Sequence, residues 1–314
     1  MLRLLDPKLD VTFKKMFADE QNRDVLISLL TAVLRPAEPI VEVTVISPEI
    51  PVGLSDDKGI LLDVLVRLKG GSLVDVEMQT QPQPGAKARA LYYWARLAAS
   101  ELHRGEEYKD LPRVALVLIL GYRAFPDAPF HGVFRVREQH SGTLFSNVLE
   151  IHTVELPKLR ELAPDDRAAE QLLVLWARFM NAPDLHELEE LAMLDPIMAR
   201  AKSILEQLSA DPDAQEAARQ RELALLNWNH SNYVAGKEGE ARGKAEGEAK
   251  GKAEGKAEGK AEGKAEGVLV VLRARGLVVS PDVEDRVKRC TDIALLDEWL
   301  QRAVVVTTAE EIFG

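Results

Sequence analysis

Hydrophobic and polar residues alternate on both sides of the turn sequence Lys69-Gly70-Gly71, through residues 61–68 and 73–79. This period of two predicts a pair of half-buried β-strands joined as a hairpin. Side chains of a strand point alternately to its two faces. The second strand therefore carries three polar side chains on one face, namely Asp75, Glu77 and Gln79.

The loop length decides whether two carboxylates meet across this hairpin. A three-residue loop, Lys69-Gly70-Gly71, would place Asp63 opposite Glu77, whereas a two-residue Gly70-Gly71 loop would place Asp63 opposite Met78. Converging carboxylates repel and are tolerated most easily with a divalent cation between them. The hairpin thus favours a hard-cation site, and the alternative is a pair of solvated carboxylates on an exposed sheet face.

The flanking sequence predicts further helices and strands around this hairpin. Residues 81–85, Gln-Pro-Gln-Pro-Gly, form a loop expected to cover or border a substrate groove. The order of helical and extended patterns predicts an α/β fold with a mixed sheet. The apolar periodicity indicates helices over residues 11–18, 24–34 and 87–104, and strands over 41–46 and 114–120.

The second half of the chain has no such alternation. Residues 161–235 follow a helical pattern, and residues 243–267 repeat Gly-Lys-Ala-Glu. Beyond residue 267, the sequence predicts three short helices: one ends at Gly276, one starts at Ser280-Pro281 and one spans 293–304. We therefore expect four parts: a core at 1–160, a helical region at 161–235, a repeat linker at 236–267 and a helical tail at 268–314.

The four-residue repeat allows two interpretations. Its period nearly matches one helical turn, so glycine and alanine would form a stripe that another helix could approach closely. Each internal glycine costs about 1 kcal/mol relative to alanine, so an isolated helix is marginal. The segment is then either a helix formed on self-association, which we favour, or a flexible charged tether.

Charge and composition exclude several classes of protein. The net charge is −11, yet residues 1–160 carry 20 basic and 21 acidic side chains, so the acidity belongs mainly to the helical region. Without a basic tract, binding to nucleic acid should be modest and salt-sensitive. A single cysteine, Cys290, excludes an intramolecular disulfide, and no apolar run is long enough to span a membrane. A cytoplasmic location is expected.

Several segments together resemble one known family. They include the opening Leu5-Asp-Pro-Lys-Leu-Asp-Val-Thr-Phe-Lys-Lys-Met-Phe17, Asp63, Val76-Glu-Met-Gln79, Arg89-Ala-Leu-Tyr-Tyr-Trp-Ala-Arg-Leu97, Gly105-Glu-Glu-Tyr108, the strand 114–120, His131 with Phe134, and residues 149–158. In this order they resemble the recombination-promoting nuclease (Rpn) family, a branch of the PD-(D/E)XK nuclease superfamily. The resemblance extends to about Met180.

The resemblance implies a restriction-endonuclease-like core and a metal-dependent DNA endonuclease. Asp63 and Glu77 would hold Mg²⁺ (or Mn²⁺), Gln79 would orient the attacking water, and Asp10 would assist as an accessory contact or else cap the first helix. Gln79 stands where the superfamily has a lysine, and an amide carries no charge. Another side chain could supply the positive charge of the missing lysine, and the candidates are Lys14, Lys87 and Arg89. The same three side chains are candidates for contact with DNA phosphates.

The expected partners are DNA and further copies of the chain, joined through the repeat and tail, with a role in recombination, mobile elements or phage defence. The alternative is a catalytically silent regulator or assembly protein with a nuclease fold, which the exchange of lysine for Gln79 favours. His131 and His152 are expected to be structural, because hydrophobic residues surround them in the sequence.

Overall fold

The computed structural model describes residues 3–46, 49–50, 60–102, 105, 107–182 and 184–314. The chain forms two compact units, Met1–Leu226 and Asn227–Gly314, and the boundary lies within the long helix α8, Pro212–Ala274. Among the described residues, none of the helices has the length and apolar character needed to cross a lipid bilayer. The four-part division of the chain stays a prediction.

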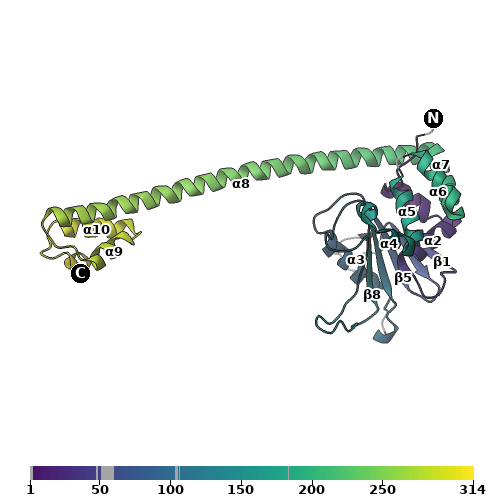
Figure 1. The fold of residues 1–314 in the computed structure, drawn as a ribbon, viewed down its shortest axis with the longest axis horizontal. Helices are drawn as coiled ribbons and strands as arrows, with labels where there is room; N and C mark the ends of the chain where they lie inside the picture. The colour runs from purple at the N-terminus through teal and green to yellow at the C-terminus, as the bar shows by residue number, and fades with distance from the viewer. Residues whose placement is uncertain (1–2, 47–48, 51–59, 103–104, 106, 183) are drawn as a thin grey trace. The chain divides into compact units, whose positions relative to one another are not determined.

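The first unit is built on a six-stranded mixed sheet, which confirms the predicted fold class (Figure 1). β5 and β6 are parallel, β6 and β8 are parallel, and the other neighbouring strands run antiparallel. A two-stranded ribbon, β2 with β3, accompanies it. In spatial order the sheet contains β1 (Val43–Ile46), β4 (Val64–Leu68), β5 (Leu73–Gln79), β6 (Val114–Leu120), β8 (Leu149–Glu155) and β7 (His131–Phe134), and the ribbon joins Glu49–Ile50 to Ile60–Leu61.

Over the central strands, one face of the sheet is covered by several helices. Phe13, Phe17 and Trp176 pack there with the valines of the central strands in one large hydrophobic cluster. Helices from residues 171–210 contribute to this same cluster, so the helical region and the sheet share a core. The helices of this part are α1 (Asp10–Phe17), α2 (Arg23–Leu34), α4 (Pro164–Ala169), α5 (Gln171–Asn181), α6 (Leu185–Leu194) and α7 (Pro196–Ala210), with 3-10 turns at Glu20–Asn22, Tyr108–Asp110 and Leu156–Glu161.

The opposite face is covered in part by a single helix, α3 (Ala86–Ser100). Its residues Ala90, Leu97 and Ala98 are buried against Leu116 and Leu118 of β6. This helix corrects one expectation, because β5 was predicted to be half-buried and all seven of its residues are buried. The predicted helix over 87–104 ends at Ser100, and residues 103–104 lie outside the described residues, as does Glu106 of the resemblance.

The second unit is a small helical bundle at the end of α8. The Ser280 hydroxyl accepts the Val283 N–H, and Gly276 adopts a left-handed φ of 76° after α8, which confirms both predicted helix boundaries. The helix that ends before Gly276 is not short, however, because it is the last part of α8. The alanines Ala261 and Ala265 of the repeat are buried in one cluster with Trp299. Besides α8, the bundle contains α9 (Pro281–Lys288), α10 (Ile293–Ala303) and a 3-10 turn at Glu310–Phe313.

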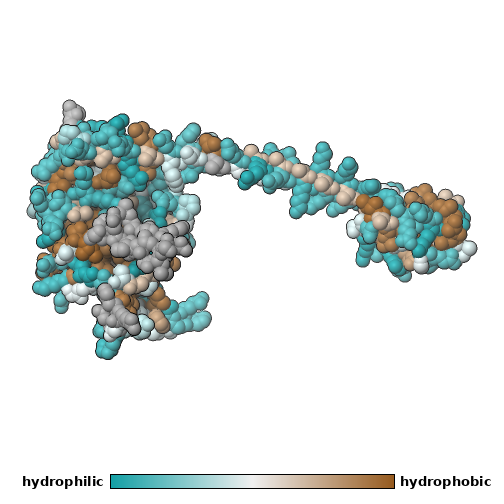
Figure 2. All heavy atoms as spheres, turned by 180° about the vertical axis from the view of Figure 1, so that it is seen from behind, coloured by the Kyte–Doolittle hydropathy of each residue, from teal (hydrophilic) through white to brown (hydrophobic). Residues whose placement is uncertain are grey.

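The Gly-Lys-Ala-Glu repeat is helical throughout, as part of α8. Figure 2 shows a tan stripe along this stretch, flanked by hydrophilic side chains. At the irregular start of the repeat, Lys244 pairs with Glu248 and Lys250 with Glu254, each at i and i+4 on the helix surface. Such exposed pairs contribute only a few tenths of a kcal/mol each. Self-association of the repeat stays a prediction.

Candidate metal and catalytic centre

The hairpin between β4 and β5 has the loop that the carboxylate pairing requires. Val64 is paired with Val76, and the Leu68 N–H donates to the Ser72 carbonyl at 2.9 Å, which leaves Lys69-Gly70-Gly71 as the loop. Both glycines have positive φ, 106° and 90°, a conformation that glycine adopts without strain. The odd loop length is confirmed, and it sets Asp63, just before β4, opposite Glu77.

Backbone N–H groups donate hydrogen bonds to the side chains of both Asp63 and Glu77. The Asp63 N–H donates to Glu77 Oε1 at 3.0 Å, and the Met78 N–H donates to Asp63 Oδ2 at 3.0 Å. The remaining oxygen of Asp63, Oδ1, lies 3.1 Å from Lys14 Nζ. Asp63 and Glu77 are 9% and 8% exposed, so both side chains are nearly enclosed. The backbone therefore fixes the two carboxyl groups side by side, with one ammonium group beside them.

Burial makes two negative charges costly at this place. Burial and, after it, the Asp63 carboxylate together raise the pKa of Glu77 to about 8, against the opposing effects of the Asp63 N–H, Arg89 and Lys14. Burial also raises the pKa of Asp63, while its hydrogen bond from Met78 and the charge of Lys14 lower it. A raised pKa means that the ionised form of the carboxyl group is destabilised in the folded chain, and a nearby positive charge stabilises that form. A bound cation would supply that charge.

A third carboxyl group, Asp75, lies on the same face of β5 and is fully buried. Within the described part of the chain, neither of its oxygens has a hydrogen-bond partner. Burial, followed by the charges of Glu77 and Asp63, raises its pKa well above the usual range. Asp75 is therefore a buried polar side chain on the face that sequence alternation predicted to be exposed.

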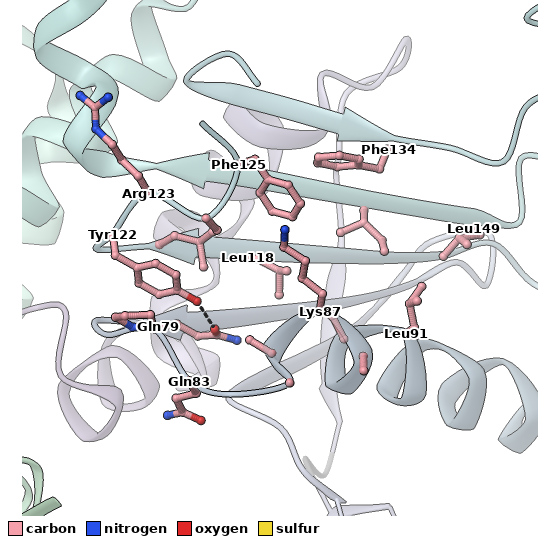
Figure 3. A pocket seen from close by; sticks show the side chains of 18 of the residues that line it. Gln79, Gln83, Lys87, Leu91, Leu118, Tyr122, Arg123, Phe125, Phe134 and Leu149 are labelled. Atoms are coloured by element: carbon pink, nitrogen blue, oxygen red, sulfur yellow. Dashed lines mark hydrogen bonds between the residues drawn. The ribbon is translucent and has the colours of Figure 1, made fainter. Parts of the chain in front are cut away.

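Gln79 follows Glu77 on the same face of β5, and a tyrosine holds it in place. The Tyr122 hydroxyl donates to Gln79 Oε1 at 3.0 Å, as the dashed line in Figure 3 shows. With its oxygen engaged, the amide presents its NH₂ group as the remaining hydrogen-bonding group. Sequence reasoning missed Tyr122, which lies 43 positions away from Gln79.

Asp10 lies near the carboxylate pair, but its side chain forms an ion pair with Arg221. It is the first residue of α1, the N-cap is Leu9, and the expected capping role of Asp10 is wrong. Its two carboxylate oxygens instead accept the Nε and Nη2 groups of Arg221, each at 2.8 Å. The negative charge of Asp10 raises the pKa of Asp63, so the two side chains are within electrostatic range. Arg221, from α8, was not identified from the sequence.

The three candidate cations occupy different positions. Lys14 is one helical turn beyond Asp10 and contacts Asp63 directly. Arg89 donates a hydrogen bond to Gln83, and its charge lowers the pKa of Glu77. Lys87 lies over the Phe125 ring, 4.2 Å from its centroid, and lines a pocket that begins at Gln79. Only Lys14 of these three makes an ion pair with Asp63 or Glu77 in the described structure.

His131 and His152 form a buried pair on β7 and β8. Their rings stack, and His131 Nε2 lies 3.0 Å from His152 Nδ1. Burial lowers the pKa of His131 to about 4 and that of His152 to about 3, so both rings are neutral. They sit on the face opposite Glu77, since His152 pairs with Val117 of the covered core. A structural role agrees with this placement.

The residues present fit a hard cation that keeps much of its water. Mg²⁺ is commonly bound through one or two carboxylates together with waters and substrate phosphates. Asp63 and Glu77 offer such a pair, and their raised pKa values indicate that added positive charge would be stabilising. Among the described residues there is no cluster of three or more His, Cys, Asp or Glu side chains of the kind that forms a protein-only cage.

A comparison with protein families agrees with this geometry. Residues 7–235 match the sequence model of one family, described as PD-(D/E)XK nuclease family transposase. The chain belongs to this family. The matched stretch contains every residue of the centre described above, from Asp10 to Arg221. Neither the curated proteins nor the solved structures contain a match to the chain.

Membership of this nuclease family fixes the general class of the chain. A nuclease- or transposase-related hydrolase that acts on nucleic acid is supported, and such nucleases are generally dependent on divalent metal. The chain departs from the family's Asp/Glu-x-Lys element at one position, because Glu77 is followed by Met78 and then Gln79. The Rpn branch, the identity of the metal and the roles of single residues stay predictions.

Proposed function

We propose that the chain is a DNA endonuclease that depends on Mg²⁺ or Mn²⁺ bound by Asp63 and Glu77. The observation that carries this proposal is the convergence of these two enclosed carboxyl groups at the hairpin, within a chain of the nuclease family. When bound, the metal would polarise a phosphoryl oxygen and lower the pKa of a water molecule. Location in the cytoplasm is part of the proposal.

The protein's own residues would orient the reactants. The Gln79 amide, anchored by Tyr122, donates its NH₂ group to the attacking water or to a phosphate oxygen. Lys14 supplies the positive charge that a lysine at position 79 would have provided, because its ammonium group lies 3.1 Å from Asp63. Asp10 assists indirectly by holding Arg221 near the centre.

A second candidate is a catalytically silent regulator or assembly protein. Two observations favour it: the uncharged Gln79, and the engagement of Asp10 and Asp63 in ion pairs with Arg221 and Lys14. In this version the repeat and tail join copies of the chain. Sedimentation velocity of the full chain measures that association, and a monomer at all concentrations would contradict it.

Nicking of supercoiled plasmid tests the nuclease directly. The full chain is incubated with Mg²⁺, with Mn²⁺ or with EDTA, and is compared with Asp63→Asn. Asparagine keeps the acceptor for the Met78 N–H but cannot supply a carboxylate to a metal. We expect cleavage only with metal, and a loss of about 100-fold or more in Asp63→Asn, because metal catalysis contributes several kcal/mol.

A matched control is Asp110→Asn, which removes an exposed carboxylate from the same unit. It should cleave at the wild-type rate. Equal cleavage by wild type and Asp63→Asn would overturn the proposed site. Absence of cleavage from a folded sample with either metal would favour the silent regulator.

A further inference from the structure

A pocket of about 740 Å³ opens on the α3 face of the sheet, directly beyond Gln79 (Figure 3). Leu118, Leu120 and Ile151 line it from the central strands, which α3 leaves partly uncovered on this side. Residues of the loop at 81–85 border it as well, as expected from the sequence. The pocket is therefore continuous with the candidate metal centre through one shared side chain, Gln79.

Three aromatic rings line this pocket. The rings of Phe125 and Phe134 lie with centroids 4.8 Å apart, and Phe134 is 37% exposed. Tyr122 stands between them and Gln79, as Figure 3 shows. Lys87 reaches from α3 over the face of the Phe125 ring. The face of the Phe125 ring beneath Lys87 offers a stacking surface to a ligand that displaces the ammonium group.

The charges around the pocket have one sign. Lys87, Arg123 and Arg135 line it, and none of the described lining residues is acidic, although the whole chain carries a net charge of −11. Arg123 is paired with Glu161 and Arg135 with Glu150. Lys87 has no carboxylate partner in the described part of the chain, so its charge is available to an anionic ligand. Aromatic rings with uncompensated positive charge are complementary to nucleic acid.

We propose that this pocket receives one unstacked nucleobase of the DNA strand whose backbone lies at Asp63 and Glu77. The base would stack on Phe125, and Lys87 would leave the ring for a neighbouring phosphate. This inference rests on the proposed nuclease function. Gln79 lines the pocket and lies two residues from Glu77 on one strand, about 7 Å away, so the pocket begins within the length of one nucleotide from the carboxylate pair.

Stacking on Phe125 requires that the base leave its duplex. A base inside a duplex has both faces covered by neighbouring bases, so neither face can lie on the ring until the base is unstacked. Removing a base from the stack costs free energy, and the cost is least for single-stranded or mismatched DNA. The chain should therefore bind single strands and mismatched duplexes more tightly than a fully paired duplex.

Fluorescence anisotropy with a labelled oligothymidine tests the pocket without any cleavage. Binding is measured in EDTA with Asp63→Asn as the parent chain. Phe125→Leu keeps an apolar side chain but removes the ring, whereas Phe125→Tyr keeps the ring. We expect Phe125→Leu to weaken binding by about tenfold or more, in the range of one lost base–aromatic stack, and Phe125→Tyr to bind as the parent does.

Two controls separate stacking from other effects. An abasic oligonucleotide has the same phosphates without bases, and it should bind Phe125→Leu and the parent equally. Phe145→Leu removes an exposed ring outside the pocket and should change nothing. Lys87→Gln should weaken binding of both oligonucleotides and lower the salt dependence by about one phosphate contact.

Equal affinity of Phe125→Leu and its parent for oligothymidine would overturn the proposal. So would an equal loss on the abasic strand, absence of binding to either strand, or binding of the paired duplex as tight as that of the single strand. The nicking assay decides the proposed function separately: cleavage without an effect of Phe125→Leu on binding would refute the pocket alone. Ring-dependent binding without cleavage would refute the nuclease and leave the pocket standing.

Discussion

The two faces of the six-stranded sheet differ in the kind of side chain that they bury. On one face, large rings such as Trp176 and Phe13 pack against the valines of β4, β5 and β6 under several helices. On the other face a single helix covers the strands in part, and Asp75, Glu77 and Gln79 are buried beneath and beside it. The first face mostly follows the ordinary rule that buried side chains are apolar, and its two buried histidines, His131 and His152, contact each other. The second breaks that rule where three polar side chains stand in one row.

The difference indicates which face serves stability and which serves chemistry. Buried carboxyl groups with raised pKa values cost free energy unless a cation or proton compensates them. The apolar face supplies enough stabilisation for the chain to tolerate this cost. The predictions below test that division, from the largest expected effect to the smallest.

Trp176→Ala should give the largest change, and only in stability. Trp176 is 1% exposed, packs on Phe17 and Phe179, and donates its indole N–H to Ser28. Truncation should lower the free energy of unfolding by about 3–5 kcal/mol. Leu91→Ala, at a half-exposed pocket position, should change it by less than about 0.5 kcal/mol. Urea titration measures both, and equal losses would contradict the division between faces.

Asp75→Val should stabilise the protein. The substitution removes a fully buried carboxyl group that has no hydrogen-bond partner among the described residues, and valine has a similar volume. The free energy of unfolding should rise by about 1–2 kcal/mol. Asp75→Asn keeps an unsatisfied polar group and should give little gain. A destabilised Asp75→Val chain would show that Asp75 has a role that the described contacts do not contain.

Tyr122→Phe should slow cleavage and leave the fold intact. The change removes only the hydroxyl that holds Gln79 Oε1, so the amide loses its fixed orientation. We expect a fall of about tenfold in the nicking rate, the size usual for partners that orient groups at a metal centre. The thermal midpoint should hardly change. An unaltered rate would mean that the orientation of Gln79 does not matter to the reaction.

Glu77→Gln should remove part of the pH dependence of stability. The pKa of Glu77 is raised from 4.5 to about 8 in the folded chain, mainly by burial. Between these values the folded state binds more protons than the unfolded state, so the free energy of unfolding falls as pH rises. In EDTA at pH 8, Glu77→Gln should therefore melt a few degrees above wild type. Near pH 4.5 the difference should vanish, and a difference independent of pH would contradict the assigned pKa.

The local part of this account follows from the sequence. The sequence allowed two loop lengths at the hairpin, and the observed loop, Lys69-Gly70-Gly71, is the one expected to set Asp63 opposite Glu77. The strand over 114–120 was predicted at its observed bounds, because a continuous apolar run fits a strand buried on both faces.

The rest depends on contacts that are distant in the sequence. Arg221 reaches Asp10 across 211 positions, and nothing in either neighbourhood indicates the pairing. The burial of β5 was missed because alternation cannot show that α3 lies over the polar face. The proximity of His131 and His152 arises from the pairing of β7 with β8, which their sequence spacing does not reveal.

Binding of Mn²⁺, followed by electron paramagnetic resonance, tests most directly the claim that the polar face holds a divalent cation. The full chain is titrated at pH 8, together with Asp63→Asn, Glu77→Gln and Asp75→Val. The account predicts saturable binding by wild type and Asp75→Val, and its loss in the other two variants. Binding that is unchanged in Asp63→Asn, or absent from folded wild type, would contradict it.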